Sequence, residues 1–310
     1  AGVVDVYARA NNAWQFSARL TASNMGDGDG FGGSVAVAGD GKTIAVGAIF
    51  EDGQTTGING PDGSESLNSG AAYVFARSGD VWSQQAYVKA SNTGEFDWFG
   101  YAVSLSADGN TLAVSAVDED SSATGLNGTQ DNNAVNASGA VYVFKRRGGA
   151  WHQSSYVKAT GTDPLDRFGN SIALAGDGQT LYFIANYDGT DEIYQLPLSG
   201  GTATRLTFEN SRVRLQQTLS DGRLLYATDN TVGPVNYWQL KLLNPQTGIA
   251  TVLPLADANS GQLDESSNTL FFTRFGLHLT GDNAKVYRGG AMGELWRWTL
   301  GSNTEAERLL

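Results

Sequence analysis

The sequence predicts an all-β fold, a β-propeller of four-stranded antiparallel blades. Two observations predict this fold. Similar segments recur along the chain with a step of 68 or 69 residues, and each recurring unit contains four short apolar segments separated by glycine-rich turns. The first two segments of a unit are small and apolar, and the fourth alternates with polar residues. This gradient is typical of a blade whose inner strands are buried and whose outer strand meets solvent.

The composition indicates a folded, turn-rich protein and excludes several classes of function. The chain has 310 residues, of which 40 are glycine and 6 are proline. Its formal net charge of -12 argues against nucleic acid as a partner, because phosphate binding needs clustered lysine and arginine. No apolar run reaches the roughly 18 residues of a membrane span. Cysteine is absent, which excludes disulfides and thiolate chemistry.

Three kinds of repeated segment mark the units. The outer-strand sequences WQFSARLTAS, WSQQAYVKAS and WHQSSYVKAT begin at Trp14, Trp82 and Trp151. Phe-Gly pairs recur at residues 31, 99 and 168. The third-strand sequences SGAAYVF and SGAVYVF begin at Ser69 and Ser138, and GVVDVYAR from Gly2 is a weaker copy.

These markers divide the chain into strands. In the first full unit we expect strands at 34–38, 43–48, 71–77 and 83–90. Units at 102–159, 171–208, 212–255 and 260–310 follow, which gives five full blades. The hairpin at residues 3–21 contributes the third and fourth strands of a sixth blade, whose two inner strands are missing from the chain. Either the ring closes imperfectly, or a second chain or a lost terminus supplies those strands.

Residues 168–186 join two parts of the chain that have different repeat lengths, which we call the two rhythms. An Asp-Gly pair at 177–178 lies between two apolar runs, which is the strongest short signal of a β-hairpin. Before this hairpin the step is 68 or 69 residues; after it the turns recur at Asp221 and Asp264, a step of 43 or 44. The connection between the second and third strands shortens, and one sheet ring could hold both kinds because loop length costs little free energy.

The two halves resemble two known families. The Phe-Gly pairs, the SGA(A/V)YVF strands and WSQQAYVKAS make residues 1–180 similar to bacterial integrin-like repeats of the FG-GAP type. ANYDGTDEIYQLPLSGGTATRLTF and FFTRFGLHLTGDNAKVYRGGAMGELWRWTLGSNTEAERL make residues 181–310 similar to the N-terminal propeller of tricorn protease and its bacterial homologues. We therefore expect one propeller over residues 1–310, formed either by a natural protein or by a chimera.

The resemblances imply no catalytic residue. Calcium-binding integrin repeats carry a DxDxDG-type loop between the first two strands, whereas the turns here are Asp-Gly pairs too short to wrap a cation. That calcium site is not carried over. In tricorn protease the chemistry belongs to domains outside this propeller, which serves access or substrate handling.

A second place for calcium is the loop face between blades. The loop after the second strand shares a face with the loop that links one blade to the next, and carboxylates with glycine and asparagine could supply the oxygen ligands that calcium prefers. The candidates are Asp27, Asp29, Glu51, Asp52, Asp118, Glu119 and Asp120, with Asp62, Asp97 and Asp131 on the same face. The alternative is a solvated rim that keeps the face soluble.

Other residue types suggest packing rather than chemistry. His152 replaces Ser83 in the outer-strand repeat and should face solvent, and with His278 as the only other histidine a zinc site lacks ligands. The tryptophans recur at fixed strand positions, which favours packing between blades over sugar binding. Several arginines could grip peptide carboxylates but more often stack on aromatic rings or pair with acidic neighbours: Arg212, Arg214, Arg223, Arg274 and Arg288.

The leading hypothesis is a non-enzymatic scaffold or binding module, with its ligand face on the acidic loop side and the central channel. The ligand could be a protein, a peptide or a glycan, and an oligomer would follow if another chain completed the ring. The alternatives are an engineered or recombined hybrid without an evolved activity, and a secreted hydrolase or lyase with an active site in the channel. Calcium is the one cofactor considered. A chain that begins without Met and in mid-pattern reads as a mature or trimmed piece, and we expect a secreted or periplasmic location.

Overall fold

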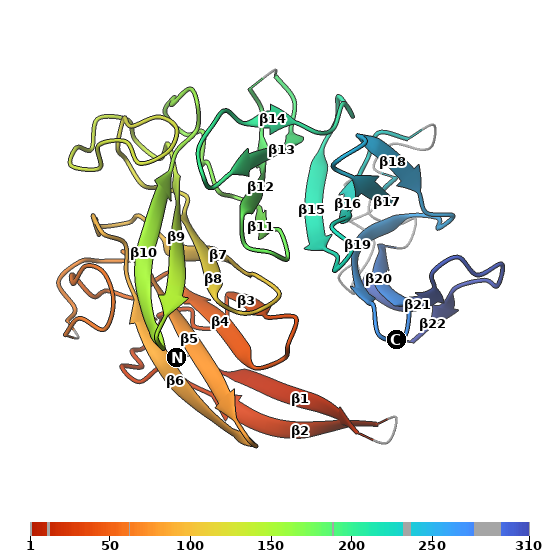
Figure 1. Ribbon diagram of the computed structural model, residues 1–310, viewed down its shortest axis with the longest axis horizontal. Coiled ribbons are helices and arrows are strands. Elements are labelled where there is room, and N and C mark those ends of the chain that lie inside the picture. Colours follow the sequence, from red (N-terminus) through yellow and green to blue (C-terminus); the bar gives the residue numbers. More distant parts are fainter. Residues whose placement is uncertain are drawn as a thin grey trace, which may run out of the picture. The chain divides into compact units, whose positions relative to one another are not determined.

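The computed structural model describes residues 2–10, 13–61, 63–187, 189–231, 237–275 and 293–309. Within these ranges the regular elements are β-strands, arranged in five four-stranded sheets and one two-stranded sheet. In each four-stranded sheet, strands that follow one another in sequence lie side by side (Figure 1). This antiparallel meander is the topology of a propeller blade. The predicted all-β propeller fold, with five full blades and an N-terminal hairpin, is confirmed.

The strand bounds follow the predicted units closely. The first blade contains β3 (Ser34–Val37), β4 (Thr43–Ala48), β5 (Ala71–Ser78) and β6 (Val81–Val88). The second contains β7 (Phe99–Leu105), β8 (Thr111–Ala116), β9 (Ala140–Arg147) and β10 (Ala150–Val157). The third contains β11 (Ile172–Leu174), β12 (Thr180–Ala185), β13 (Glu192–Pro197) and β14 (Thr204–Arg205).

The remaining two blades belong to the part of the chain with the shorter repeat. The fourth contains β15 (Val213–Thr218), β16 (Leu224–Thr228), β17 (Gln239–Asn244) and β18 (Ile249–Val252). The fifth contains β19 (Ala258–Asp264), β20 (Thr269–Phe275), β21 (Gly293–Thr299) and β22 (Glu307–Arg308).

The chain packs as two compact units. One comprises residues 1–183 and 195–204, and the other comprises residues 184–194 and 205–310. The division passes through the third blade, whose first two strands include the junction between the rhythms. That both units belong to one propeller stays a prediction.

The second strands of the first two blades are buried along their whole length. Every residue of β4 and of β8 is buried, because each has a strand along both edges and a packed layer on both faces. The expectation that the first strand is buried in the same way is wrong for β3, where Val35 and Val37 are exposed. β3 lies at the end of its sheet and pairs with β4 alone within that sheet, and its residues alternate between half-buried and exposed, so one of its faces meets solvent.

The Phe-Gly pairs connect successive blades. The ring of Phe99 packs edge-on against Tyr142, with centroids 5.3 Å apart, and lies at the centre of a core shared by the first two blades. Gly100 follows with φ of +93°, and a Cβ atom there would lie 2.2 Å from the carbonyl oxygen of Ala71 in β5. Only glycine permits both this conformation and this close approach.

The hairpin at the junction forms as predicted. β11 and β12 pair in antiparallel register, with Ile172 opposite Phe183. The N–H of Gly178 donates to the carbonyl oxygen of Ala175 at 2.8 Å, and the N–H of Gln179 donates to the Asp177 carboxylate at 2.9 Å. Gly41, Gly109 and Gly222 make the same kind of turn, each with a positive φ. The turn that both rhythms use is therefore one local structure, stabilised by an Asp side chain and a left-handed Gly.

The N-terminal hairpin consists of β1 (Val4–Ala10) and β2 (Ala13–Leu20). Its apolar residues Val4, Val6, Ala18 and Leu20 pack against the core of the first blade. Among the described residues there is no helix long and apolar enough to cross a membrane.

Candidate functional site

Two long loops, residues 49–70 and 117–139, leave the second strands of the first two blades and return to the third strands. Each loop carries a glutamate that lies buried beneath the acidic residues of the loop face. These glutamates, Glu51 and Glu119, organise two polar networks of nearly identical composition. The networks are the most distinctive chemical feature of the first compact unit.

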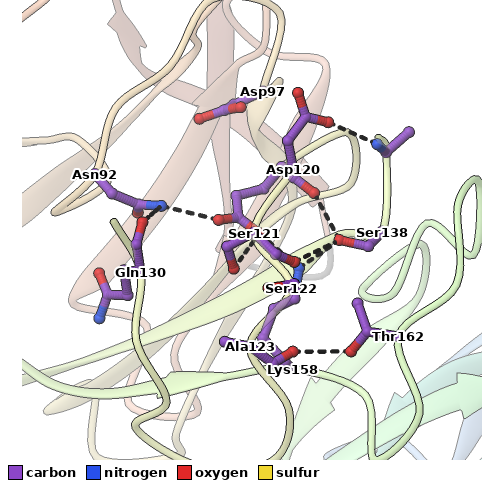
Figure 2. Close-up of polar contacts among 12 residues, drawn as sticks. Asn92, Asp97, Asp120, Ser121, Ser122, Ala123, Gln130, Ser138, Lys158 and Thr162 are labelled. Atoms are coloured by element: carbon purple, nitrogen blue, oxygen red, sulfur yellow. Dashed lines mark hydrogen bonds and ion pairs between the residues drawn. The ribbon is translucent and has the colours of Figure 1, made fainter. Parts of the chain in front are cut away.

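The network around Glu119 connects three parts of the second blade with the loop that enters it, and Figure 2 labels Asn92, Ser138 and Lys158 among its members. Lys158, which follows β10, places its Nζ 2.6 Å from a Glu119 carboxylate oxygen, and the two residues are 2% and 1% exposed. The same Nζ donates to the Ser138 Oγ at 2.6 Å. The Tyr156 hydroxyl and the Asn92 amide donate to the other carboxylate oxygen at 2.9 and 2.8 Å.

The network around Glu51 repeats this arrangement. Lys89 Nζ lies 2.7 Å from the Glu51 carboxylate and 2.7 Å from the Ser69 Oγ. The Tyr87 hydroxyl donates to Glu51 at 2.7 Å, and the Asn24 amide donates to it at 3.2 Å. Because each carboxylate has a cation and two further donors, the cost of burying its charge is offset by charge-assisted hydrogen bonds.

The serine and lysine in each network are arranged as an anchor rather than as a nucleophile and its base. Ser138 Oγ accepts from Lys158 and lies within donating distance of the carbonyl oxygens of Glu119 and Ser121, at 3.1 and 3.0 Å. Its proton is therefore directed to the loop backbone. Burial lowers the pKa of Lys158, but the nearby Glu119 carboxylate opposes that shift by stabilising the charged form. The geometry ties both ends of the loop to the outer strand.

The aspartates beside these glutamates hold backbone amides. Asp120 accepts the N–H of Ala137 at 2.6 Å, and Asp52 accepts the N–H of Asn68 at 2.7 Å. In the loops that link the blades, Asp97 accepts the N–H of Gly94 and Asp29 accepts the N–H of Gly26, both at 2.8 Å. Burial, together with the negative charge of nearby Glu119, raises the pKa of the Asp97 carboxyl to about 7.

The linking loop of the second blade contains bulky residues in an unusual backbone conformation. Phe96 has φ of 64° and Trp98 has φ of 57°, in the left-handed region that non-glycine residues rarely adopt. The corresponding residues of the preceding loop are Gly28 and Gly30, which adopt it without strain. The Phe96 side chain is 47% exposed.

The second compact unit contains a related network. Glu209 accepts the Tyr226 hydroxyl at 2.6 Å and the Asn230 amide at 3.1 Å. Lys241 Nζ lies 2.8 Å from its carboxylate. A buried Glu–Lys pair capped by a tyrosine hydroxyl thus occurs in both repeat types.

The structure gathers most of the residues considered for calcium, but each has other contacts. Glu51 and Glu119 are paired with lysines, Asp118 is paired with Arg167 at 2.9 Å, and Asp27 is exposed. In the part of the chain that the structure describes, no group of three or more His, Asp or Glu side chains has the geometry to hold a metal ion. Calcium binding stays a prediction. A thermal midpoint that rises at millimolar calcium would support it, and an unchanged midpoint would count against it.

The packing roles predicted for the arginines that the structure describes, and for Trp151, Trp238 and Trp298, are confirmed, but the packing role is wrong for Trp14, which is 64% exposed. Trp151 is buried and donates its indole N–H to Gln85 of the preceding blade at 2.9 Å. Arg214 stacks over Trp238 at 4.3 Å, Arg274 stacks over Trp296 at 4.2 Å, and Arg223 pairs with Asp221. His152 is exposed, as expected. Asp62, His278 and Arg288 lie outside the described residues.

Sequence reasoning missed the lysine, serine and tyrosine of the two networks. The signal was present, since YVKA and SGA recur at matching positions: Ser69, Tyr87 and Lys89 in one unit, and Ser138, Tyr156 and Lys158 in the next. A lysine that recurs in an apolar strand end, two residues after a recurring tyrosine, indicates a buried partner.

Comparison with protein families agrees with this division. Residues 14–75 and 82–144 match the FG-GAP repeat, and residues 168–310 match the tricorn protease N-terminal β-propeller domain. The chain joins two repeat families. The FG-GAP matches contain the whole network around Glu51, and Glu119 and Ser138 of the other network, whereas Tyr156 and Lys158 follow the second match; the tricorn-type match begins at Phe168, the last Phe-Gly pair.

Individual relatives are more distant. The tricorn protease homolog 1 of Streptomyces coelicolor is 28% identical over 131 residues, which cover 41% of this chain and 12% of that protein. Hydrazine synthase of Kuenenia stuttgartiensis is 13% identical, with a TM-score of 0.50 over 93% of this chain and 68% of that one. TolB from Acinetobacter baumannii is 16% identical, with a TM-score of 0.49 over 86% and 51%. The chain thus spans about an eighth of its curated relative, and the hydrazine synthase similarity shows the fold alone.

Proposed function

We propose that this chain is a non-enzymatic binding module whose ligand face is the acidic loop side of the FG-GAP blades. The proposal rests on the left-handed backbone conformation of Phe96 and Trp98, which lie in a loop beside the buried, hydrogen-bonded network around Glu119. Such a conformation costs of the order of 1–3 kcal/mol for a bulky residue. Glycine occupies the equivalent positions in the preceding loop, so the fold itself does not require an aromatic residue there.

An exposed apolar cluster surrounds Phe96. We define the loop-face patch as Phe50, Leu67 and Phe96, which are all exposed. The N–H of Phe96 donates to the carbonyl oxygen of Leu67 at 2.8 Å, and the Phe50 ring lies 6.2 Å from the ring of Trp98. Exposed apolar groups held together by ordered backbone contacts are typical of interaction sites.

The charge around the patch favours a particular kind of ligand. Glu65 and Glu95 are exposed in the same loops, Asp27 is exposed in the loop that enters the first blade, and the whole chain carries a net charge of -12. A peptide segment that combines an apolar or aromatic anchor with lysine or arginine would complement both features. The buried networks contribute by keeping the loops ordered before the ligand binds, which lowers the entropic cost of association.

The test uses a random peptide library displayed on phage, selected on the wild-type protein. We expect the enriched peptides to be basic and to carry an apolar anchor. Their dissociation constants are then compared between the wild-type protein and the variant Phe96→Gly. This variant keeps the left-handed backbone without strain, so it should be as stable as the wild type or about 1 kcal/mol more stable, while binding weakens at least tenfold.

The matched control is Leu165→Gly, which relieves the same left-handed strain in the following loop, at φ of 68°, outside the defined patch. It should bind the selected peptides as the wild type does. Equal binding by Phe96→Gly and the wild type would contradict the proposal. A selection without enriched peptides would favour the alternative of a hybrid that has no evolved ligand.

A further inference from the structure

We propose that the open edge of β1 binds a β-hairpin of the FG-GAP type, which completes a four-stranded blade. The occupant is a polypeptide with two short strands of small apolar residues joined by an Asp-Gly turn, as in residues 34–48 of this chain. This surface is separate from the loop-face patch, and the proposal does not depend on the proposed function.

The first support is the register of the N-terminal hairpin. Val4 lies opposite Leu20 and Val6 lies opposite Ala18, and the pairing then shifts by one residue before Tyr7. In the first blade, β5 and β6 pair with the same pattern. Ala72 lies opposite Val88, Val74 lies opposite Ala86, and the shift occurs before Phe75. The N-terminal hairpin is therefore structurally the outer half of a blade, including its bulge.

The second support is the exposure of residues that a complete blade buries. Tyr7 occupies the position of Phe75 in β5 and of Phe144 in β9. Tyr7 is 53% exposed, whereas Phe75 is 3% exposed and Phe144 is fully buried. The opposite residue, Phe16, is also exposed and packs edge-on against Tyr7 with ring centroids 5.8 Å apart.

The third support is the direction of the backbone donors. The N–H of Arg77 donates to the carbonyl oxygen of Lys42, which directly precedes β4, so the donors of Arg77, Phe75 and Tyr73 point toward that strand. Tyr7 and Asp5 occupy the positions of Phe75 and Tyr73 in this register. Their N–H groups therefore point away from β2. Within the described residues β1 belongs to a sheet with β2 alone (Figure 1). An edge with donors directed outward is a template for another strand.

The edges of β5 and β9 that correspond to the open edge of β1 show which kind of strand fits there. β5 pairs with β4, of sequence TIAVGA, and β9 pairs with β8, of sequence TLAVSA, and both inner strands are wholly buried. In each case the inner strand is preceded by a first strand and an Asp-Gly turn. A second copy of this chain has its own hairpins of this kind engaged in its blades, so the geometry points to a separate hairpin as the occupant.

The experiment titrates a fluorescein-labelled synthetic peptide of residues 34–48 with the whole chain and follows fluorescence anisotropy. Hydrogen exchange, read by mass spectrometry or NMR, locates the bound peptide. We expect saturable binding and slower exchange at the amides of Asp5 and Tyr7. The variant Tyr7→Pro removes one outward donor without removing a hydrogen bond to β2, and it should weaken binding about tenfold or more.

Two controls keep the test decisive. The first is a peptide with Ala45→Pro, which interrupts the pairing strand and should not bind. The second is the variant Asp5→Pro, which removes a different outward donor and replaces Tyr7→Pro if that variant fails to fold. The proposal is overturned if the peptide does not raise the anisotropy, if both proline variants bind it as the wild type does, or if protection appears on another strand. It is also overturned if light scattering shows a dimer whose β1 amides are already protected without peptide, because a second copy would then cover the edge.

Discussion

At the scale of single residues, the FG-GAP blades depend on charges that are buried rather than exposed. Lys158 and Glu119 are both withdrawn from water, and each satisfies the other. Such a pair contributes little net stability compared with a well-packed apolar pair, but removing one partner leaves an uncompensated charge in a low-dielectric environment. The networks therefore make the position of the loop depend strongly on a few side chains.

We predict that Lys158→Met lowers the free energy of unfolding by about 3–5 kcal/mol, because Glu119 is left buried without its cation. Urea unfolding measures this loss. The exposed Lys42→Met serves as the matched control and should change stability by less than about 0.5 kcal/mol. The double variant Glu119→Gln with Lys158→Met should recover part of the loss. A loss below about 1 kcal/mol for Lys158→Met would contradict the account.

The Asp97 carboxyl makes stability depend on pH. Its pKa is raised to about 7 by burial and by nearby Glu119 and Asp120, although Lys89 opposes the shift, whereas an aspartate in an unfolded chain has a pKa of about 3.9. Between these values the folded state binds more protons than the unfolded state. The contribution of this group to stability is therefore present at about pH 4 and is lost as the pH rises to about 7.

We predict that Asp97→Asn removes this dependence while keeping an oxygen that can accept the N–H of Gly94. Wild type and variant are compared by urea unfolding at several values between pH 4.5 and pH 8. Relative to the variant, the wild type should lose stability progressively up to about pH 7 and then level off. Parallel stability curves for the two proteins would show that Asp97 is not the responsible group.

At the scale of elements, the Phe-Gly pair is the part that turns the chain from one blade into the next. The phenylalanine fills the core, and the glycine allows the backbone to pass within contact distance of the preceding blade. Gly41 and Gly222 in Asp-Gly turns and Gly57 and Gly125 in the long loops also have a positive φ, but they have open space where a side chain would lie. The two kinds of glycine therefore differ in what a substitution costs.

We predict that Gly100→Ala destabilises the protein by more than about 4 kcal/mol or prevents folding, because the new methyl group would lie 2.2 Å from the carbonyl oxygen of Ala71. Gly125→Ala, with φ of +67° and no atom nearby, should cost only about 1–2 kcal/mol for its left-handed backbone. Thermal or urea unfolding separates the two. Similar losses for both variants would contradict the role given to the Phe-Gly pair.

At the scale of the molecule, the blade pattern could be predicted from sequence, and the recurring lysine indicated a buried partner, but the identity of that partner could not be predicted. The repeats and Asp-Gly turns gave the bounds of β4, Thr43–Ala48, directly. They could not show that Lys89 meets Glu51, because the two residues are 38 positions apart and joined only when the long loop folds back on the outer strand. The alternating outer strand was expected to meet solvent, whereas Lys89, directly after that strand, is buried by tertiary packing.

The same limit applies to the binding face. The sequence located an acidic loop face, but the left-handed backbone of Phe96 follows from the loop's path and from hydrogen bonds to the neighbouring loop. The Asp-Gly hairpin at residues 168–186 lies at the start of the part that matches the tricorn-type propeller. The junction is accommodated because the Asp-Gly turns before it and after it have the same pattern of backbone hydrogen bonds.

The central claim is that buried Glu–Lys networks hold the long loops in place. Hydrogen exchange of backbone amides in Lys158→Met tests it most directly. The amide of Gly139 donates to the carbonyl oxygen of Glu119, and the amide of Gly70 donates to that of Glu51 in the intact network. We predict exchange at least tenfold faster at Gly139 and unchanged exchange at Gly70. Unchanged exchange at Gly139, or equal acceleration at both amides, would contradict the claim.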